Sequence, residues 1–407
     1  MKEICIINYG SNAAVYGIGT HIREYVRCLL GTGWKIYLVE LGLDEKNTEV
    51  YVTENTQVQT IHIPYVYGAD MTTYNKSVCR LLRLYLKDST DLIFHFHYLQ
   101  SDSLLTHIKR HFPLSKSVLS IHYLYWSARL IGNLALYQDI VEKQNRKSVR
   151  EKYKDVIDNY QQEKDFMNTV DKIVCLASDT YALLTELYGI KEEKLTVIPN
   201  GLTPKKKLVA SEKRKGLRKS YYIRDDEKLI LFVGRIDSIK GVAPLLSCFD
   251  RVVSKYPNCR LVLIGDGNIN SMIKYAGKAI TKITFLGRLD KHTVYQWYQM
   301  ADLAVFPSYY EECSYVGIEM LMHGVPLVAS NGYGVKNMFN AFNAVIAPIE
   351  NWEKPQAFED NLLNGICTLL ESEELSMLKR QQAQQEFRRT YQLKSMHEKY
   401  VELFAGL

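Results

Sequence analysis

Short apolar runs alternate with longer segments of helical period along the whole chain. Most runs are continuously apolar, as expected of strands that are covered on both faces. Because helix-like stretches separate most of them, the pattern predicts βαβ units and mainly parallel sheets. The expected strands are Ile4–Ile7, Lys35–Val39, Thr60–Ile63, Leu92–Phe96, Val118–Ile121, Ile173–Leu176 and Thr196–Ile198, followed by Lys228–Val233, Arg260–Ile264, Ile283–Leu286, Leu303–Phe306, Pro326–Ala329 and Val345–Ile346.

A turn at Pro199-Asn200-Gly201 divides this pattern into two halves, and a length of 407 residues suits two domains. We expect an N-terminal domain at 1–200 and a C-terminal domain at 201–385. The segment 386–407 is predicted to form a final helix that crosses back to the N-terminal domain, because its apolar face needs cover. A long polar segment at about 127–168 fits one or two surface helices.

Composition indicates an ordinary globular protein, with 47% apolar and 24% charged residues. No apolar run approaches the roughly 20 residues that span a bilayer, and the first residues lack the pattern of a signal peptide. The eight cysteines are scattered without a C-x-x-C pair, which is typical of buried, reduced thiols. We therefore expect a cytoplasmic protein.

The net charge of +6 comes from one stretch, Lys205 to Lys219, which holds eight basic residues and one acidic residue. Residues 1–200 carry equal numbers of basic and acidic side chains. A solvated linker or helix edge explains such a run, and contact with an acidic lipid surface or acceptor is the alternative. This distribution of charge gives no indication of a nucleic-acid partner. It is compatible with a peripheral position on the inner membrane face, which stays an expectation.

The segment 302–330 carries the strongest chemical signal. Its strand ends at Pro307-Ser308, and a loop containing Glu311 leads into a helix that begins near Ser314. Backbone N–H groups of Ser314, Tyr315 and Val316 are expected to face a bound anion at the start of this helix. Glu319 lies about one turn inside it, where a carboxylate can accept hydrogen bonds from ribose hydroxyls. Alternatively, both glutamates are solvated or only favour the helix dipole.

Several segments of the chain resemble retaining glycosyltransferase family 4, the glycosyl transferases group 1, and they occur along the chain in the same order as in that family. Glu311 and Glu319 match the family's Glu-(seven residues)-Glu motif. The other matching segments are the Gly17-Ile18-Gly19-Thr20-His21 loop, Asp91–His97 and Ser120–His122 at two strand ends, Val170–Ser178, Val197–Gly201, Val233–Gly241 with Gly234, Arg235 and Lys240, Leu263–Gly267 and Phe285–Arg288. The resemblance implies an α/β protein of the GT-B fold, with two Rossmann-like domains that face one another across a cleft.

The resemblance also implies roles for the C-terminal domain. Arg235 and Lys240 would grip the donor diphosphate, and Glu319 would bind the ribose. Glu311 would bind the donor sugar and take part in catalysis with both cations. The remaining nucleotide contacts are expected from Gly234, Ser314, Tyr315 and Val316, and from the main chain of Gly287, Arg288 and Leu289 against the base.

In the N-terminal domain, Gly17 and Gly19 would let the backbone approach the phosphate. His122, at a strand end, would face the sugar and act in catalysis. His95 and His97 lie on alternate positions of one strand, where packed structural histidines and site residues are both expected.

The family transfers sugars with retention, so the resemblance implies a hexosyltransferase-like enzyme that uses a nucleotide-sugar co-substrate, a UDP- or GDP-sugar, and no separate cofactor. The acceptor would be a glycan, a lipid-linked hydroxyl or another hydroxyl. The chain has no Asp-x-Asp triplet, and we expect no metal requirement, with cationic side chains neutralising the diphosphate.

One departure leaves other functions open. Glu312-Cys313-Ser314 replaces the family's Gly-Phe-Gly, so the loop loses two glycines. A catalytically silent nucleotide-sugar-binding protein of the same fold is one alternative, and a sugar-nucleotide 2-epimerase is another. A pyridoxal-phosphate-dependent phosphorylase is disfavoured because such enzymes are much larger.

Overall fold

The computed structural model describes residues 1–9, 17–42, 51–54, 57–65, 69–99, 102–204, 211–352 and 354–407. These residues form two compact units. The first unit comprises Met1–Trp126, Tyr137–Asn200 and Leu393–Leu407, and the second comprises Ser127–Leu136 and Gly201–Gln392. Lys205–Lys207 of the basic run lie outside the described residues.

An eight-stranded sheet forms the centre of the first unit, in the order β3-β4-β2-β1-β5-β6-β7-β8. Its strands are β1 (Glu3–Tyr9), β2 (Lys35–Leu41), β3 (Tyr51–Glu54), β4 (Val58–Ile63), β5 (Leu92–Phe96), β6 (Lys116–Ile121), β7 (Lys172–Cys175) and β8 (Leu195–Val197). Every pairing is parallel except that of β3 with β4, and Ile6 of β1 lies between Leu38 of β2 and His95 of β5. The short antiparallel edge strand β3 is absent from the predicted strands.

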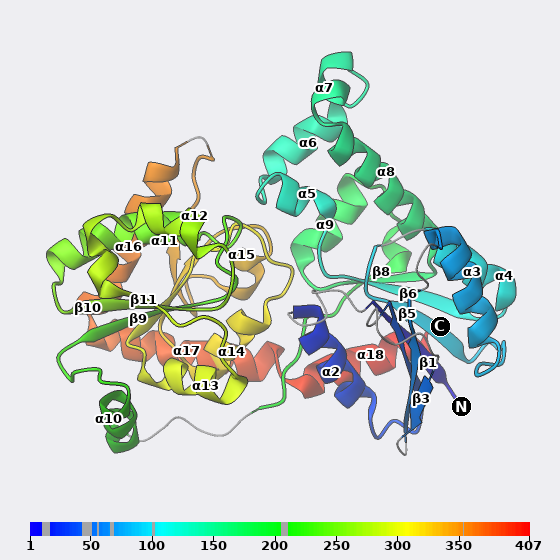
Figure 1. Cartoon of the computed structure of the whole chain (residues 1–407), viewed down its shortest axis with the longest axis horizontal. Helices are drawn as coiled ribbons and strands as arrows, with labels where there is room; N and C mark the ends of the chain where they lie inside the picture. Colours follow the sequence, from blue (N-terminus) through cyan, green and yellow to red (C-terminus); the bar gives the residue numbers. More distant parts are fainter. Residues whose placement is uncertain are drawn as a thin grey trace. The chain divides into compact units, whose positions relative to one another are not determined.

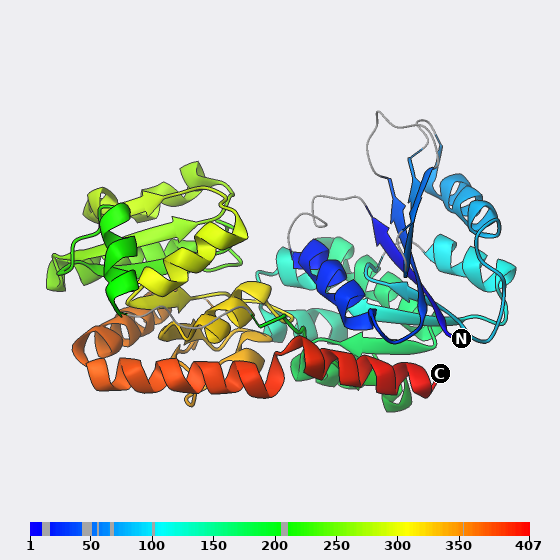
Figure 2. The same ribbon diagram turned by 90° about the horizontal axis from the view of Figure 1, so that it is seen from below.

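Helices connect these strands. They are α2 (Gly17–Leu29), α3 (Met71–Leu82), α4 (Asp102–His111), α5 (Tyr125–Arg129), α6 (Leu134–Glu142), α7 (Lys147–Lys152), α8 (Lys154–Thr169) and α9 (Ser178–Glu186), with a 3₁₀ turn at Glu192–Lys194 and the final helix α18 (Leu393–Ala405). The final helix α18 packs against α2 (Figure 1 and Figure 2). Its apolar residues Met396, Tyr400, Leu403 and Phe404 are all buried.

The segment predicted as one or two surface helices contains four, α5 to α8. A break after α5 is enforced by Ile131 and Gly132, which both adopt positive φ angles. The segment is also not confined to the surface. Glu163 of α8 is buried, where its carboxylate accepts hydrogen bonds from the Tyr125 amide at 2.8 Å and the Tyr188 hydroxyl at 2.6 Å. Helical period alone did not reveal these breaks or this polar contact.

The second unit has a six-stranded parallel sheet in the order β11-β10-β9-β12-β13-β14. Its strands are β9 (Lys228–Val233), β10 (Cys259–Ile264), β11 (Ile283–Phe285), β12 (Leu303–Phe306), β13 (Leu327–Ser330) and β14 (Val345–Ala347). Its helices are α10 (Ser211–Ser220), α11 (Val242–Lys255), α12 (Ile269–Met272), α13 (Lys291–Met300), α14 (Tyr315–His323), α15 (Val335–Met338), α16 (Pro355–Glu371) and α17 (Glu373–Thr390), with 3₁₀ turns at Ile273–Tyr275 and Gly277–Lys282. Figure 1 shows α11 and α16 on one face of this sheet and α13, α14 and α17 on the other.

The end of α17 explains why the final helix starts later than 386. Ala383 and Phe387 of α17 are buried, and α17 packs along α14 in the second unit. Residues 386–390 therefore complete a helix of the second unit, and α18 begins only at Leu393.

Both sheets contain a switch point, where the order of strand addition reverses beside the first strand. It lies between β1 and β5 in the first unit and between β9 and β12 in the second. In open α/β sheets, ligands bind in the crevice outside the carboxyl ends of the strands at this point. The two switch points are therefore where the chemistry of each unit is expected.

The basic run predicted as a solvated edge is partly folded into the second unit. Arg218 of α10 is buried, and its guanidinium donates to the Met300 carbonyl at 2.9 Å and pairs with Asp302. Arg214 also pairs with Asp302, at 2.9 Å. Lys213, Lys215 and Lys219 are exposed. Among the described residues, no helix is both long and apolar enough to cross a bilayer.

A close backbone contact holds the loops at the second switch point together. Gly241, at the start of α11, has a φ of 69°, and a Cβ atom on it would lie 2.0 Å from the Pro307 carbonyl oxygen at the end of β12. Only glycine accommodates both the left-handed backbone and this approach.

We predict that Gly241→Ala destabilises the second unit by on the order of 3 kcal/mol, because a left-handed alanine is strained and its methyl group would push two loops apart. Gly216→Ala is a matched control, since Gly216 is exposed within α10 and a Cβ there meets nothing within 4 Å. The control should be stabilising by about 0.5–1 kcal/mol. Thermal unfolding checks both variants, and equal midpoints for Gly241→Ala and the parent would contradict this packing.

Candidate functional site

Most of the predicted donor-site residues follow the carboxyl ends of strands in the second unit. Gly234, Arg235 and Lys240 follow β9, and Glu311 follows β12, so these residues flank the switch point of this sheet. The segment from Gly287 to Leu289 follows β11. The topology therefore brings residues that are 71 positions apart, such as Lys240 and Glu311, into contact.

Lys240 and Glu311 form an ion pair. The Lys240 ammonium donates to a Glu311 carboxylate oxygen at 2.6 Å, and the Ser308 hydroxyl donates to the same oxygen at 2.9 Å. The two charged side chains are only 22% and 10% exposed. Glu311 is therefore not a solvated loop glutamate, because its charge is neutralised by a partner across the switch point.

Asp237 ties the two predicted cations to one loop. Its carboxylate pairs with the Arg235 guanidinium and accepts the backbone N–H of Lys240 at 3.0 Å. The Arg235 side chain is half exposed. Sequence reasoning assigned no role to Asp237, because the turn that follows β9 is what brings its carboxylate to Arg235 and to the Lys240 N–H.

Glu319 is buried within α14. Its carboxylate pairs with the Lys291 ammonium and accepts the Tyr298 hydroxyl at 3.3 Å. Burial and the neighbouring carboxylate raise the pKa of Tyr298 well above its usual value. Lys291, at the start of α13, was missed by sequence reasoning, since nothing in its local pattern distinguishes it from other surface lysines.

Ser314 caps helix α14, and its side chain accepts the Gly317 N–H at 3.4 Å. The Ser314 N–H points to the Met338 sulfur at 3.2 Å, and its contact with a bound anion stays a prediction. Tyr315 and Val316 occupy the first turn of the helix, and their contact with an anion stays a prediction.

The Glu312-Cys313 loop is held by tight packing in place of the family's glycines. A Cβ on Gly334 would lie 1.7 Å from the Glu311 carbonyl oxygen, and the Glu311 N–H donates to the Tyr333 carbonyl at 2.9 Å. The rings of Tyr310 and Tyr333 stack at 5.0 Å, and the Tyr310 hydroxyl donates to the buried Glu312. This packing fixes the backbone position of Glu311 in the loop that follows β12.

Gly234 and Gly287 support the same edge of the sheet. A Cβ on Gly265 would lie 1.9 Å from the Gly234 carbonyl oxygen, and the Gly287 carbonyl accepts the Gly265 N–H at 2.8 Å. Arg288 is exposed and Leu289 is partly buried. Their contact with a nucleotide base stays a prediction.

In the first unit, Gly17 and Gly19 are not in a loop. Both belong to the first turn of α2, and Gly19 is buried there. The helix extends to this point because Ile18 and Ile22 lie one turn apart and are both buried. The approach of this backbone to a phosphate stays a prediction.

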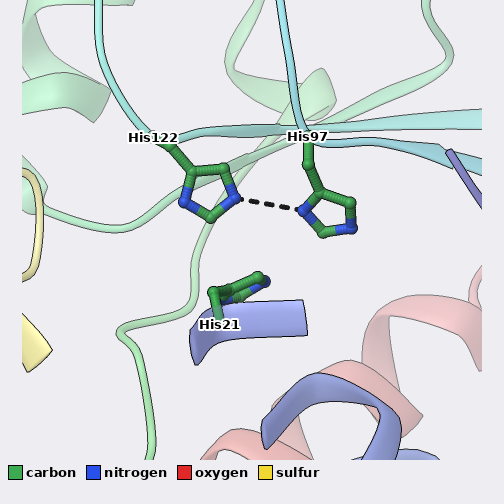
Figure 3. Close-up of side chains that lie close together, drawn as sticks. All are labelled: His21, His97 and His122. Atoms are coloured by element: carbon green, nitrogen blue, oxygen red, sulfur yellow. Dashed lines mark hydrogen bonds between the residues drawn. The ribbon is translucent and has the colours of Figure 1, made fainter. Parts of the chain in front are cut away.

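His122 belongs to a group of imidazoles at the switch point of the first sheet. His21 comes from α2, His97 directly follows β5, and His122 directly follows β6. Figure 3 shows the three rings turned toward one another, with His97 Nδ1 3.1 Å from His122 Nε2. Burial lowers the pKa of His122 and of His97 well below the usual value, so both rings are neutral at physiological pH.

His95 differs from this group. It is buried, with Nδ1 2.6 Å from the Tyr25 hydroxyl and Nε2 2.9 Å from the Ser120 hydroxyl. Both ring nitrogens are thus satisfied within the core, which supports the structural interpretation of His95. The expectation that His122 faces a sugar stays a prediction.

Two family models match the chain. The model for glycosyltransferase family 4 matches residues 15–206, and the model for glycosyl transferases group 1 matches residues 213–385. An uncharacterized glycosyltransferase of Methanocaldococcus jannaschii is 28% identical over 178 residues, which are 42% of this chain and 45% of that protein. This match therefore extends over about half the length of its relative.

Solved structures share the fold over the whole chain. Sucrose-phosphate synthase from Thermosynechococcus elongatus has a TM-score of 0.75 at 18% identity, with 100% of both chains covered. The Anabaena protein HepE, solved in complex with UDP-glucose, has a TM-score of 0.68 at 14% identity, again with 100% of both chains covered. The two family matches and the shared two-domain α/β fold show that this chain belongs to the group 1 glycosyltransferases of the GT-B fold.

Proposed function

We propose that this protein is an enzyme that transfers a sugar from a nucleotide-sugar donor to a hydroxyl acceptor with retention at the anomeric carbon. The observation that carries the proposal is the Lys240–Glu311 pair at the switch point of the second sheet. A ligand with a diphosphate joined to a sugar suits this pair, because the cation can bind the diphosphate and the carboxylate can accept hydrogen bonds from the sugar. The UDP-glucose complex named for the Anabaena protein supports a donor of this class.

In the protein without ligand, the ion pair neutralises both charges, and a bound donor would replace it with new contacts for each side chain. A diphosphate would compete with Glu311 for the Lys240 ammonium, and Arg235 in the same loop would add a second cation. Glu311, with Ser308 beside it, would then accept hydrogen bonds from sugar hydroxyls. As the glycosidic bond breaks, negative charge grows on the diphosphate, so the two cations stabilise the transition state more than the ground state.

Glu319 is proposed to bind the ribose. Its carboxylate is held in one place by Lys291 and Tyr298, so it is preorganised to accept hydrogen bonds from two neighbouring hydroxyls. The Lys291 ammonium compensates the buried charge of the Glu319 carboxylate.

Retention is proposed to follow a front-face path, in which the departing phosphate oxygen takes the proton of the acceptor hydroxyl. His122 is proposed to contribute a neutral imidazole to the sugar from the first unit. For the acceptor, the exposed Lys213, Lys215 and Lys219 of α10 favour an anionic or membrane-bound partner over a neutral one.

We predict that Lys240→Met lowers kcat/KM by a factor on the order of 10²–10³, equivalent to about 2.7–4 kcal/mol of transition-state stabilisation, because a preorganised cation at the leaving group is lost. Arg235→Ala should have an effect of the same order. Lys255→Met is the matched control, since Lys255 ends the same helix that follows Lys240 and pairs with Glu371 on the surface. Turnover should be measured by release of the nucleoside diphosphate.

Nucleotide affinity, measured by calorimetry, separates binding from catalysis. Glu319→Ala should weaken nucleotide binding with a smaller effect on kcat, because ribose contacts change little during the reaction. Normal turnover in both Lys240→Met and Arg235→Ala would show that the assigned site is wrong. Nucleotide-sugar binding by the parent without any turnover would favour a silent binding protein.

We predict that activity persists in EDTA, because Lys240 and Arg235 neutralise the diphosphate in place of a divalent ion. The measurement compares donor turnover before and after chelation, followed by addition of Mg²⁺ or Mn²⁺. Loss of activity that either ion restores would contradict the proposed role of the cationic side chains.

A further inference from the structure

Three imidazoles from three separate elements converge at the switch point of the first sheet. His21, His97 and His122 each offer one nitrogen, and these nitrogens all lie within 4.8 Å of one another. His21 and His97 are buried and His122 is partly buried. Because β5 and β6 are rigid neighbours in the sheet, the positions of His97 and His122 are set by the fold.

The spacing of these nitrogens is close to that of metal ligands. Two imidazole nitrogens on one tetrahedral Zn²⁺, each about 2.0–2.1 Å from the ion, are roughly 3.3 Å apart. His97 Nδ1 and His122 Nε2 are 3.1 Å apart. The separation of the two nitrogens therefore fits two ligands of one ion, once the rings turn their lone pairs from one another toward it.

His21 also has the partner expected of a metal ligand. Its Nδ1 lies 2.8 Å from Asn200 Oδ1, and an amide oxygen can only accept. Nδ1 therefore carries the proton, and the lone pair of the ring is on Nε2. A hydrogen bond from the second ring nitrogen to a fixed acceptor is the arrangement that orients metal-bound histidines.

The chemistry of the three rings selects the class of ion. All three candidate ligand atoms are imidazole nitrogens, and a neutral imidazole binds a metal ion through the lone pair of one ring nitrogen. Neutral imidazoles suit zinc, copper, nickel and iron, whereas Mg²⁺ and Ca²⁺ prefer oxygen ligands. The site is therefore distinct from a magnesium or manganese site on a diphosphate.

We propose that His21, His97 and His122 form a binding site for a divalent transition-metal ion of the zinc type, with the remaining coordination position open to water. Bound metal would occupy the lone pair of His122 and so inhibit the proposed sugar transfer. The inhibition rests on the proposed function, whereas metal binding itself does not.

Binding is tested on the full chain with Co²⁺ as a spectroscopic probe for zinc. We expect one Co²⁺ per chain, with the strong visible absorption of four-coordinate cobalt, and displacement of this signal by Zn²⁺ but not by Mg²⁺. His97→Gln and His21→Gln should each abolish the signal. Asn200→Ala should weaken affinity on the order of 10–100-fold, because it removes the acceptor that orients His21.

The control removes two histidines that lie outside the proposed site. His107 and His111 lie one turn apart on α4, where a surface pair can bind metal weakly. The double variant His107→Gln/His111→Gln should keep the cobalt signal. Circular dichroism of every variant separates loss of a ligand from loss of the fold.

Absence of a stoichiometric cobalt signal in the parent would overturn the site. A signal that survives in His97→Gln and His21→Gln but disappears in the α4 variant would place the metal on the surface and also overturn it. If cobalt binds as expected, Zn²⁺ should inhibit turnover of the parent, and EDTA should restore it. Stoichiometric binding without inhibition would keep the metal site and count against the proposed role of His122 in sugar transfer.

Discussion

The order of the strands in each sheet decides where polar chemistry can gather. Helices cover the two faces of a parallel sheet, but the connections after the first strand and after its new neighbour run to opposite faces at the switch point. In the second unit this point separates β9 from β12, and in the first unit it separates β1 from β5. Lys240 and Glu311 meet across one of these points, and His21 and His97 meet across the other.

The two clusters stabilise their polar groups in different ways. In the second unit, opposite charges are paired, as in Lys240 with Glu311 and Lys291 with Glu319, which offsets the cost of removing these charges from water. In the first unit, the imidazoles are kept neutral by burial, and their nitrogens contact one another or nearby amide and hydroxyl groups. Paired charges suit an anionic ligand that can replace the carboxylate as the partner of the lysine. Neutral imidazoles suit proton transfer or the binding of a metal ion.

Close backbone packing supports the charged cluster. The backbone at Gly241 and at Gly334 leaves no room for a side chain against the Pro307 and Glu311 carbonyls, so the loops that carry both ends of the ion pair pack closely on their neighbours. The Glu312-Cys313 segment, which lacks the family's glycines, is fixed by the stacked rings of Tyr310 and Tyr333. Preorganisation of this kind matters because a displaced cation or carboxylate loses most of its effect on a developing charge.

The sequence by itself determined the described strands other than the edge strand β3, the α/β class and the family, because continuous apolar runs and ordered motifs are local signals. Leu92–Phe96, Lys228–Val233 and Leu303–Phe306 have the predicted bounds. The sequence also singled out Lys240, Glu311 and Glu319 as candidate site residues. Their partners Asp237, Lys291 and Tyr298 emerged only from the tertiary structure, as did the grouping of His21 with His97 and His122. Ion pairs and imidazole contacts between distant segments depend on strand order and on how helices dock, and no local pattern encodes either.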